Sequence, residues 1–253
     1  GGNWDAWFGA IGYIEAVNSL ASVEFEHPGW CAPEFSPCQS GTAVCIIATG
    51  MGHPLLPDAE CVLNDLEIGP SGSLVLLTGS NMSGKSTLLR AVGLNVTLAL
   101  AGANCCCHSF RLPLLRIATS IRLADSIGRG TSLFLAEVLR LREIVSAIND
   151  SNIRPTVVLI DEILHGTNSR ERCIAVDRFI TYMLATSAIG IVTTHDLDVA
   201  DKSAKRDSLR LFHFRDSIND SDGAPRMVFD YLLRPGPTTH TNAIRIIDLM
   251  GLP

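Results

Sequence analysis

A glycine-containing loop that directly follows a short apolar run is the feature that most constrains this chain. Residues 79–86 (GSNMSGKS) fit the pattern G-x-x-x-x-G-K-[ST] without exception. An apolar run at 74–77 precedes the loop, and apolar residues recur every four positions from Leu88 to Leu100 after it. A buried strand, a tight turn and an amphipathic helix in this order place backbone N–H groups and the positive end of a helix around a phosphate. The sequence therefore predicts a nucleotide-binding loop.

The residue types of the loop each have a role in phosphate binding. Glycine lets the backbone wrap the phosphate oxygens, Lys85 is expected to reach the β- and γ-phosphates, and the Ser86 hydroxyl is expected to ligate Mg²⁺. The candidate nucleotide-binding residues are Gly79, Ser80, Asn81, Met82, Ser83, Gly84, Lys85 and Ser86.

Two carboxylates follow a second apolar run. Residues 157–160 lead directly into Asp161 and Glu162, and parallel strands deliver their last side chains to the ligand edge of a sheet. Asp161 is suited to hold Mg²⁺ through its water shell, and Glu162 can polarise an attacking water. The alternative is a strand that simply meets solvent at an acidic end.

His195 and Ser132 are further candidates. His195 lies just beyond a third apolar run, 189–193, where it can hydrogen-bond a γ-phosphate or the attacking water, although a lone histidine is often structural. Ser132 follows a glycine-rich turn and precedes a helical pattern. It is equally well explained as an ordinary N-cap or as part of an anion site.

Runs with strand and helix patterns alternate along the chain and predict an α/β fold with a mostly parallel central sheet flanked by helices. The expected strands are 43–48, 74–77, 156–160, 189–193, 209–214 and 227–233, and the expected helices are 5–21, 86–100, 132–148, 169–184 and 242–250.

Composition excludes several classes of protein. The 253 residues include 20 Lys and Arg against 26 Asp and Glu, a net charge of −6, which argues against a dedicated basic nucleic-acid module. The longest apolar-leaning run, 91–107, is too short and too polar for a membrane span, and no signal-peptide pattern is visible. We therefore expect no membrane partner.

The eight cysteines include no C-x-x-C pair. Because adjacent residues of a strand point to opposite faces, Cys105, Cys106 and Cys107 suit a zinc site poorly. We expect reduced, mostly buried thiols in an intracellular reducing compartment, the cytoplasm, the nucleus or an organelle.

Taken together, these residues resemble the ATPase domain of the MutS family of DNA mismatch repair proteins, over about residues 50–253. The matching motifs are His53-Pro54, Asn64-Asp65, the T-G-x-N-M-x-G-K-S-T loop from Thr78 to Thr87, the S-x-F-x-x-E motif at Ser132, Phe134 and Glu137, the D-E-x-x-x-G-T motif from Asp161 to Thr167, Thr194-His195, and the terminal 235–237 and 251–253 elements. The Asn-Met pair within the loop is far more specific than the general pattern.

The resemblance implies a P-loop NTPase with ABC-type ATPase architecture at 41–253, preceded at 1–40 by the end of a helical lever. It adds Asn64 and Thr87 to the nucleotide-binding residues and assigns Glu162, His195, Lys85 and Ser132 to catalysis, with Ser86 and Asp161 at Mg²⁺. Two such domains are expected to face each other, so that Ser132 of one completes the ATP site of the other. DNA is expected to bind through domains outside this chain.

The sequence also departs from the usual pattern of the family. The residues that resemble a divergent branch of MutS-related proteins are Ser83, the run 111–116, Asn168-Ser169 and residues 241–243. Cys61 stands three positions before Asn64, where the family usually has an aromatic residue that stacks on adenine. The mismatch-reading domain and the helix-turn-helix extension after the terminal Gly-Leu-Pro are absent from this sequence.

Two functions follow. The first is an Mg²⁺-dependent ATPase that drives a DNA-binding clamp, and the alternative is an ATP-gated binding and dimerisation module with negligible turnover. A transporter ATPase lacks support because there is no L-S-G-G-Q signature. A small kinase is disfavoured because two long helical segments and a serine motif separate the phosphate loop from Asp161.

Overall fold

The computed structural model describes residues 4–37, 44–80, 82–121, 133–150, 154–164, 169–195, 206–219 and 226–238. The helices are α1 (Trp4–Glu26), α2 (Lys85–Ala101), α3 (Leu133–Asn149) and α4 (Ser169–Leu184). The strands are β1 (Glu34–Ser36), β2 (Ile46–Met51), β3 (Asn64–Ile68), β4 (Leu74–Thr78), β5 (Ser109–Pro113), β6 (Arg116–Ser120), β7 (Thr156–Ile160), β8 (Ile189–Thr194), β9 (Leu209–Asn219) and β10 (Arg226–Pro235).

A six-stranded sheet in the order β10-β9-β4-β8-β7-β6 forms the centre of the molecule. Its neighbouring strands are parallel except for β10, which pairs with β9 in antiparallel fashion. Every residue of β4, β7 and β8 is buried, as expected for parallel strands covered on both faces. The predicted α/β fold with a mostly parallel sheet flanked by helices is confirmed.

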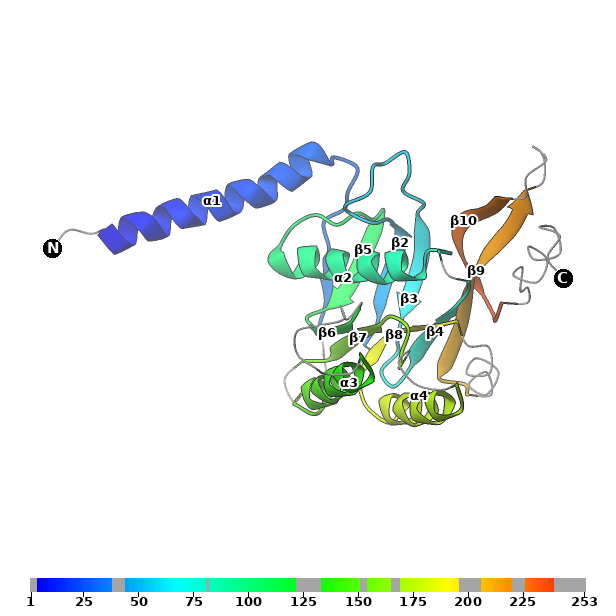
Figure 1. Cartoon of the computed structure of the whole chain (residues 1–253). Helices are drawn as coiled ribbons and strands as arrows, with labels where there is room; N and C mark the ends of the chain where they lie inside the picture. The colour runs from blue at the N-terminus through cyan, green and yellow to red at the C-terminus, as the bar shows by residue number, and fades with distance from the viewer. Residues whose placement is uncertain are drawn as a thin grey trace.

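Two apolar cores lie on opposite faces of this sheet. Leu159 points into the core formed with α2 and the smaller sheet, whereas its neighbour Val158 points into the core formed with α3 and α4. Figure 1 shows the same layers, with α2 on one side of the six-stranded sheet and α3 and α4 on the other. Because neighbouring residues of a central strand pack into different cores, each strand is held between the two layers of helices and sheet, with its carboxyl end at the same edge.

The smaller sheet has the order β1-β5-β2-β3 and was largely missed by the sequence prediction. The strand expected at 43–48 begins later and continues through Gly50 to Met51. Gly50 has a φ of 57°, and its N–H donates to Asp65 Oδ1 over 2.8 Å. This turn-like residue shifts the register with β3 instead of ending the strand, because a side chain from the neighbouring strand satisfies its amide.

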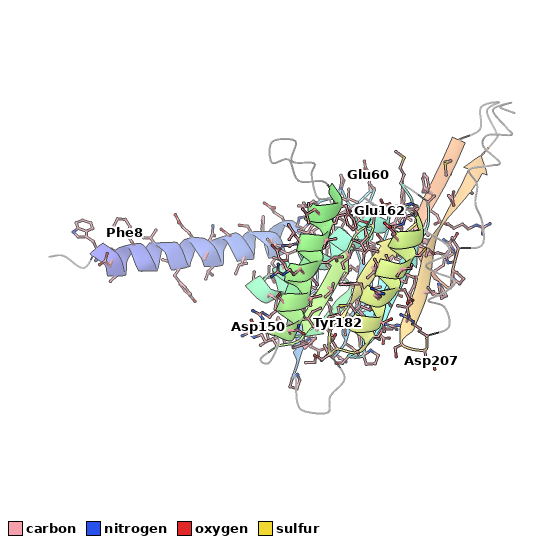
Figure 2. All side chains as sticks on the ribbon, turned by 60° about the horizontal axis from the view of Figure 1, so that its bottom comes forward. Phe8, Glu60, Asp150, Glu162, Tyr182 and Asp207 are labelled. Carbon is pink, nitrogen blue, oxygen red and sulfur yellow. The ribbon has the colours of Figure 1, made fainter. Side chains whose placement is uncertain are left out.

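The N-terminal helix extends away from the sheets, and Figure 2 shows Phe8 near its outer end, far from both sheets. The helix predicted at 5–21 is longer in the structure, and none of its residues is buried. After it, β1 pairs with β5. The division at residue 40 stays a prediction, and the helix expected at 242–250 lies outside the described residues. Among the described helices, none has both the length and the apolar character that crossing a bilayer requires.

Gly190 provides a test of the sheet packing. It pairs with Val158, and a Cβ atom at this position would overlap the Val158 carbonyl oxygen. We expect Gly190→Ala to lower the free energy of unfolding in urea by about 1–3 kcal/mol, because overpacked backbone must shift. Gly9→Ala is the matched control, since nothing lies within 4 Å of its Cβ position. Equal stability of the two variants would contradict the packing described here.

Candidate functional site

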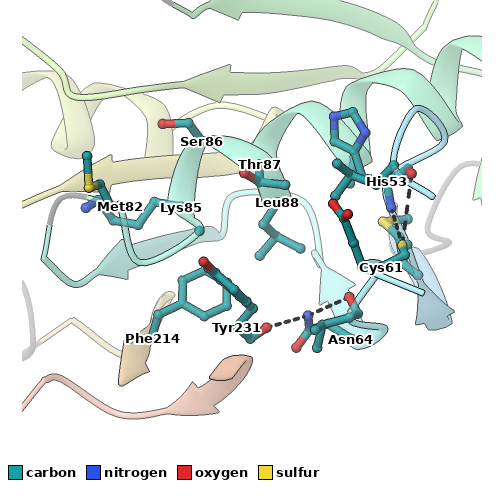
Figure 3. A pocket seen from close by; sticks show the side chains of 17 residues that line it. His53, Cys61, Asn64, Met82, Lys85, Ser86, Thr87, Leu88, Phe214 and Tyr231 are labelled. Atoms are coloured by element: carbon teal, nitrogen blue, oxygen red, sulfur yellow. Dashed lines mark hydrogen bonds between the residues drawn. The ribbon is translucent and has the colours of Figure 1, made fainter. Parts of the chain in front are cut away.

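A cavity of about 650 Å³ opens where β4 ends and α2 begins (Figure 3). Its lining comes from the phosphate loop, from α2, from the segment between β2 and β3, and from β9 and β10. The lining residues are Met51, Gly52, His53, Leu56, Glu60, Cys61, Val62, Asn64, Met82, Gly84, Lys85, Ser86, Thr87, Leu88, Ala91, Phe214 and Tyr231. Both sheets therefore contribute to one pocket at the carboxyl edge of β4.

The loop between β4 and α2 has a backbone suited to an anion. Gly79, Met82 and Gly84 have φ values of 146°, 70° and 106°. Gly84 precedes α2 and provides no side-chain cap for the helix. The hydroxyl oxygens of Ser80 and Ser83 are buried without a hydrogen-bond partner. An uncapped helix N-terminus beside unpaired hydroxyls offers donors that a phosphate group can accept from.

Lys85 is only 4% exposed, although it carries an ammonium group. Its Nζ donates to the carbonyl oxygens of Gly79 and Ser80 over 2.8 and 2.7 Å. Burial lowers the pKa of Lys85, while the nearby Glu162 and Asp161 carboxylates act in the opposite direction. A buried cation at the start of a helix favours an anionic ligand in the adjoining cavity.

The two predicted carboxylates lie at the end of β7, beside the end of β8. Thr193 Oγ1 donates to Asp161 Oδ1 over 2.8 Å and accepts from the Glu162 N–H over 2.9 Å. His195 Nδ1 lies 3.6 Å from Glu162 Oε1. Figure 2 shows Glu162 at the same end of the molecule as Glu60, which lines the cavity. The structure thus brings Asp161, Glu162 and His195 together, as the sequence predicted.

Asn64 lines the cavity, and its amide group joins the two sheets. Its Nδ2 donates to the Tyr231 carbonyl over 3.0 Å, and its Oδ1 accepts from the Leu233 N–H over 2.7 Å. Figure 3 shows the contact with Tyr231, whose ring lies across the cavity from Thr87. The amide is therefore committed to β10, and a direct contact of Asn64 with a nucleotide stays a prediction.

Comparison with known proteins identifies the family. The family model for MutS domain V matches residues 75–253, which is more than half of the chain. The chain belongs to the MutS domain V family. It is 30% identical to the DNA mismatch repair protein MSH6 of Arabidopsis thaliana over 99% of this chain, and 27% identical to the DNA mismatch repair protein MutS of Natronomonas pharaonis over 96%. It is also 32% identical to the MutS of an Exiguobacterium species over 79% of this chain.

This MutS-family chain spans only 19–27% of the length of these relatives. The comparisons therefore concern one region of longer proteins. Assignment to a divergent branch of the family stays a prediction.

Some predicted site residues of this MutS-family chain lie outside the described part. They are Asn81 in the phosphate loop and Ser132, together with residues 128–131 before Ser132 and residues 166–168 after Glu162. Met82 is described and is 85% exposed at the mouth of the loop.

Two aromatic side chains of the pocket, Tyr231 and Phe214, are marked by no motif in the sequence. Tyr231 has a φ of 55°, and a Cβ atom on Gly84 would lie 3.0 Å from its ring. No local pattern marks it, since 167 residues separate it from Asn64. Only the pairing of distant strands reveals it as a candidate contact for a nucleobase.

The described cysteines are all free thiols, and Cys105, Cys106 and Cys107 are buried. Burial raises the pKa of Cys105 and of Cys106 to about 12 each and raises that of Cys107 further. The strand assumed at 105–107 is wrong: Cys105 forms an isolated bridge with Cys31, and bends follow it. No strand forms there because the Cys106 N–H donates to the Asn95 side chain instead of to a neighbouring strand.

The Asn64 amide provides the test of how the pocket is assembled. We expect Asn64→Ala to remove protection from hydrogen exchange at the Leu233 amide and to lower the free energy of unfolding by about 1–3 kcal/mol, because it leaves buried polar groups unpaired. Asn18→Ala on the exposed face of α1 serves as the control. Unchanged exchange at Leu233 would show that β10 is held by other contacts.

Proposed function

We propose that this chain is an Mg²⁺-dependent ATPase domain that drives a DNA-binding clamp. The observation that carries the proposal is the convergence of a buried ammonium, an uncapped helix N-terminus and two carboxylates at one sheet edge. This set matches the requirements of phosphoryl transfer, in which catalysis depends on positioning and on charge stabilisation.

The phosphate loop, residues 79–87, binds the phosphates of ATP in this proposal. The Lys85 ammonium exchanges its two carbonyl partners for phosphate oxygens, which stabilise its charge better. Tyr231 offers its ring to the base from β10, and the smaller Cys61 forms the opposite wall. Cys61 is held there by the His53 N–H, which donates to its sulfur over 3.3 Å.

Mg²⁺ fits the oxygen donors near the loop. The Ser86 hydroxyl and the Asp161 carboxylate would hold it, and both are the hard oxygen ligands that this ion prefers. The ion supplies neutralisation of the phosphate charge.

Glu162 acts as the general base in the proposal. Its carboxylate accepts a proton from the attacking water while the water oxygen attacks the γ-phosphorus and the bond to ADP breaks. His195, close to the Glu162 carboxylate, orients that water or contacts the γ-phosphate. The products are ADP and inorganic phosphate.

The partner we propose is a second MutS-like ATPase domain, as a homodimer or heterodimer. Ser132, which precedes α3 in the sequence, then completes the partner's site together with the N-terminus of that helix. DNA binds through domains beyond this chain, and residues 1–40 form the end of the lever that connects them. The relatives are named for DNA mismatch repair, and the free thiols support a reducing intracellular compartment.

Glu162→Gln and Lys85→Ala separate binding from hydrolysis. We expect Glu162→Gln to bind Mg·ATP but to hydrolyse it at least about a hundredfold more slowly, because the amide cannot take a proton. We expect Lys85→Ala to lose ATP binding. Calorimetric titration and phosphate release measure the two effects, with the exposed Glu143→Gln as control. Turnover unchanged in Glu162→Gln would remove it as the base, whereas wild-type binding without turnover would support the ATP-gated module.

Ser132 tests the composite site. We expect specific ATPase activity to rise with protein concentration, because each site needs a second copy, and Ser132→Ala to reduce turnover only in the dimer. Sedimentation at the assay concentrations reports the oligomeric state. Full activity in a proven monomer, or an equal effect of the variant there, would argue for a self-contained site.

A further inference from the structure

Thr193, which directly precedes the Thr194-His195 motif, is hydrogen-bonded to the Asp161 carboxylate and to the Glu162 backbone. It is the second-to-last residue of β8, and its side chain is completely buried. A hydroxyl has one proton to donate and two lone pairs to accept with. Thr193 uses them in opposite directions, donating to Asp161 Oδ1 and accepting from the Glu162 N–H.

These two bonds join consecutive residues with different proposed tasks. The bond to Asp161 engages one carboxylate oxygen, Oδ1, and thereby orients the carboxylate whose role is to hold Mg²⁺. The bond to the Glu162 amide fixes the backbone from which the general base projects. One hydroxyl therefore sets the relative positions of both groups.

The backbone conformation of Glu162 depends on its hydrogen bond to Thr193. Glu162 has a φ of 52°, a left-handed conformation that is unfavourable for a residue with a side chain. Such a conformation persists only where the surroundings hold it. The Asp161 N–H is held by the Ser120 carbonyl over 2.8 Å, and the Glu162 N–H by Thr193. The turn after β7 is thus anchored on both neighbouring strands.

The same end of β8 also carries His195. His195 directly follows β8, so Thr193 and His195 both lie at the carboxyl end of this strand, which pairs with β7. Thr193 contacts the Glu162 backbone, and His195 Nδ1 lies 3.6 Å from the Glu162 carboxylate. Thr193 thus contacts the backbone of Glu162, whereas His195 lies near its carboxylate.

We propose that Thr193 is a positioning residue for ATP hydrolysis. Its hydroxyl fixes the Asp161 carboxylate and the Glu162 backbone relative to each other. The proposal rests on the ATPase function above. Thr193 does not touch the reacting atoms. Its effect passes through the two carboxylates, so it acts on turnover and on the use of Mg²⁺ more than on nucleotide affinity.

The test compares Thr193→Val and Thr193→Ser with the matched control Thr156→Val in the full chain. Thr156 is also buried in the same sheet, at the opposite end of β7, and its hydroxyl has no hydrogen-bond partner. Steady-state phosphate release gives kcat and KM for ATP, and a Mg²⁺ titration gives the concentration for half-maximal turnover. Thermal unfolding of each variant reports whether it is folded.

We expect Thr193→Val to lower kcat about tenfold, the size of one lost hydrogen bond, with KM changed less than about threefold. The Mg²⁺ concentration for half-maximal turnover should rise, Thr193→Ser should restore both values, and Thr156→Val should change neither. If the valine variant does not fold, Thr193→Ala removes the same hydroxyl without introducing a second methyl group.

Wild-type turnover with an unimpaired, folded Thr193→Val variant would overturn this role and leave the proposed function intact. A serine variant as impaired as the valine variant would also overturn it, because the hydroxyl would not be the cause. Absence of ATP hydrolysis in the wild-type protein would overturn the proposed function and this role together.

Discussion

The parallel pairing of β4 with β8, and of β8 with β7, is the constraint on which the rest of the structure depends. Parallel strands put their carboxyl ends at one edge, and burial on both faces prevents any strand from sliding without exposing apolar side chains. The phosphate loop follows β4 at this edge, the two carboxylates follow β7, Thr193 lies near the end of β8, and His195 follows β8. Chemistry carried by segments that are far apart in the sequence meets there because of this strand pairing and burial.

The second constraint is the link between the two sheets. The six-stranded sheet provides the phosphate and carboxylate side of the site, whereas the segment that connects β2 and β3 of the smaller sheet provides the wall with His53 and Cys61. Asn64 joins them through its bonds to the backbone of β10. Hydrogen bonds from one buried amide thus place Tyr231 over the start of α2, and the shape of the pocket depends on that amide as much as on the loop.

Most of the central sheet and the chemistry-bearing residues could be predicted from the sequence, because the signals are local. The apolar runs that became β4, β7 and β8 are continuous, and α2 and α4 have clear helical spacing. The strands of the smaller sheet could not be found in the same way. β3 and β5 are only five residues long and include exposed polar residues, and β2 continues through Gly50, so none of the three is a continuous apolar run.

By itself, the sequence determined the phosphate loop, the acidic end of β7 and the α/β class, since loop chemistry and apolar periodicity are properties of neighbouring residues. Only the tertiary structure decided that Thr193 links Asp161 to Glu162, that Asn64 is committed to β10 and that Tyr231 enters the pocket. Those contacts join residues 31, 32 and 167 positions apart. Such pairings follow from the order and register of strands, which no short stretch of sequence encodes.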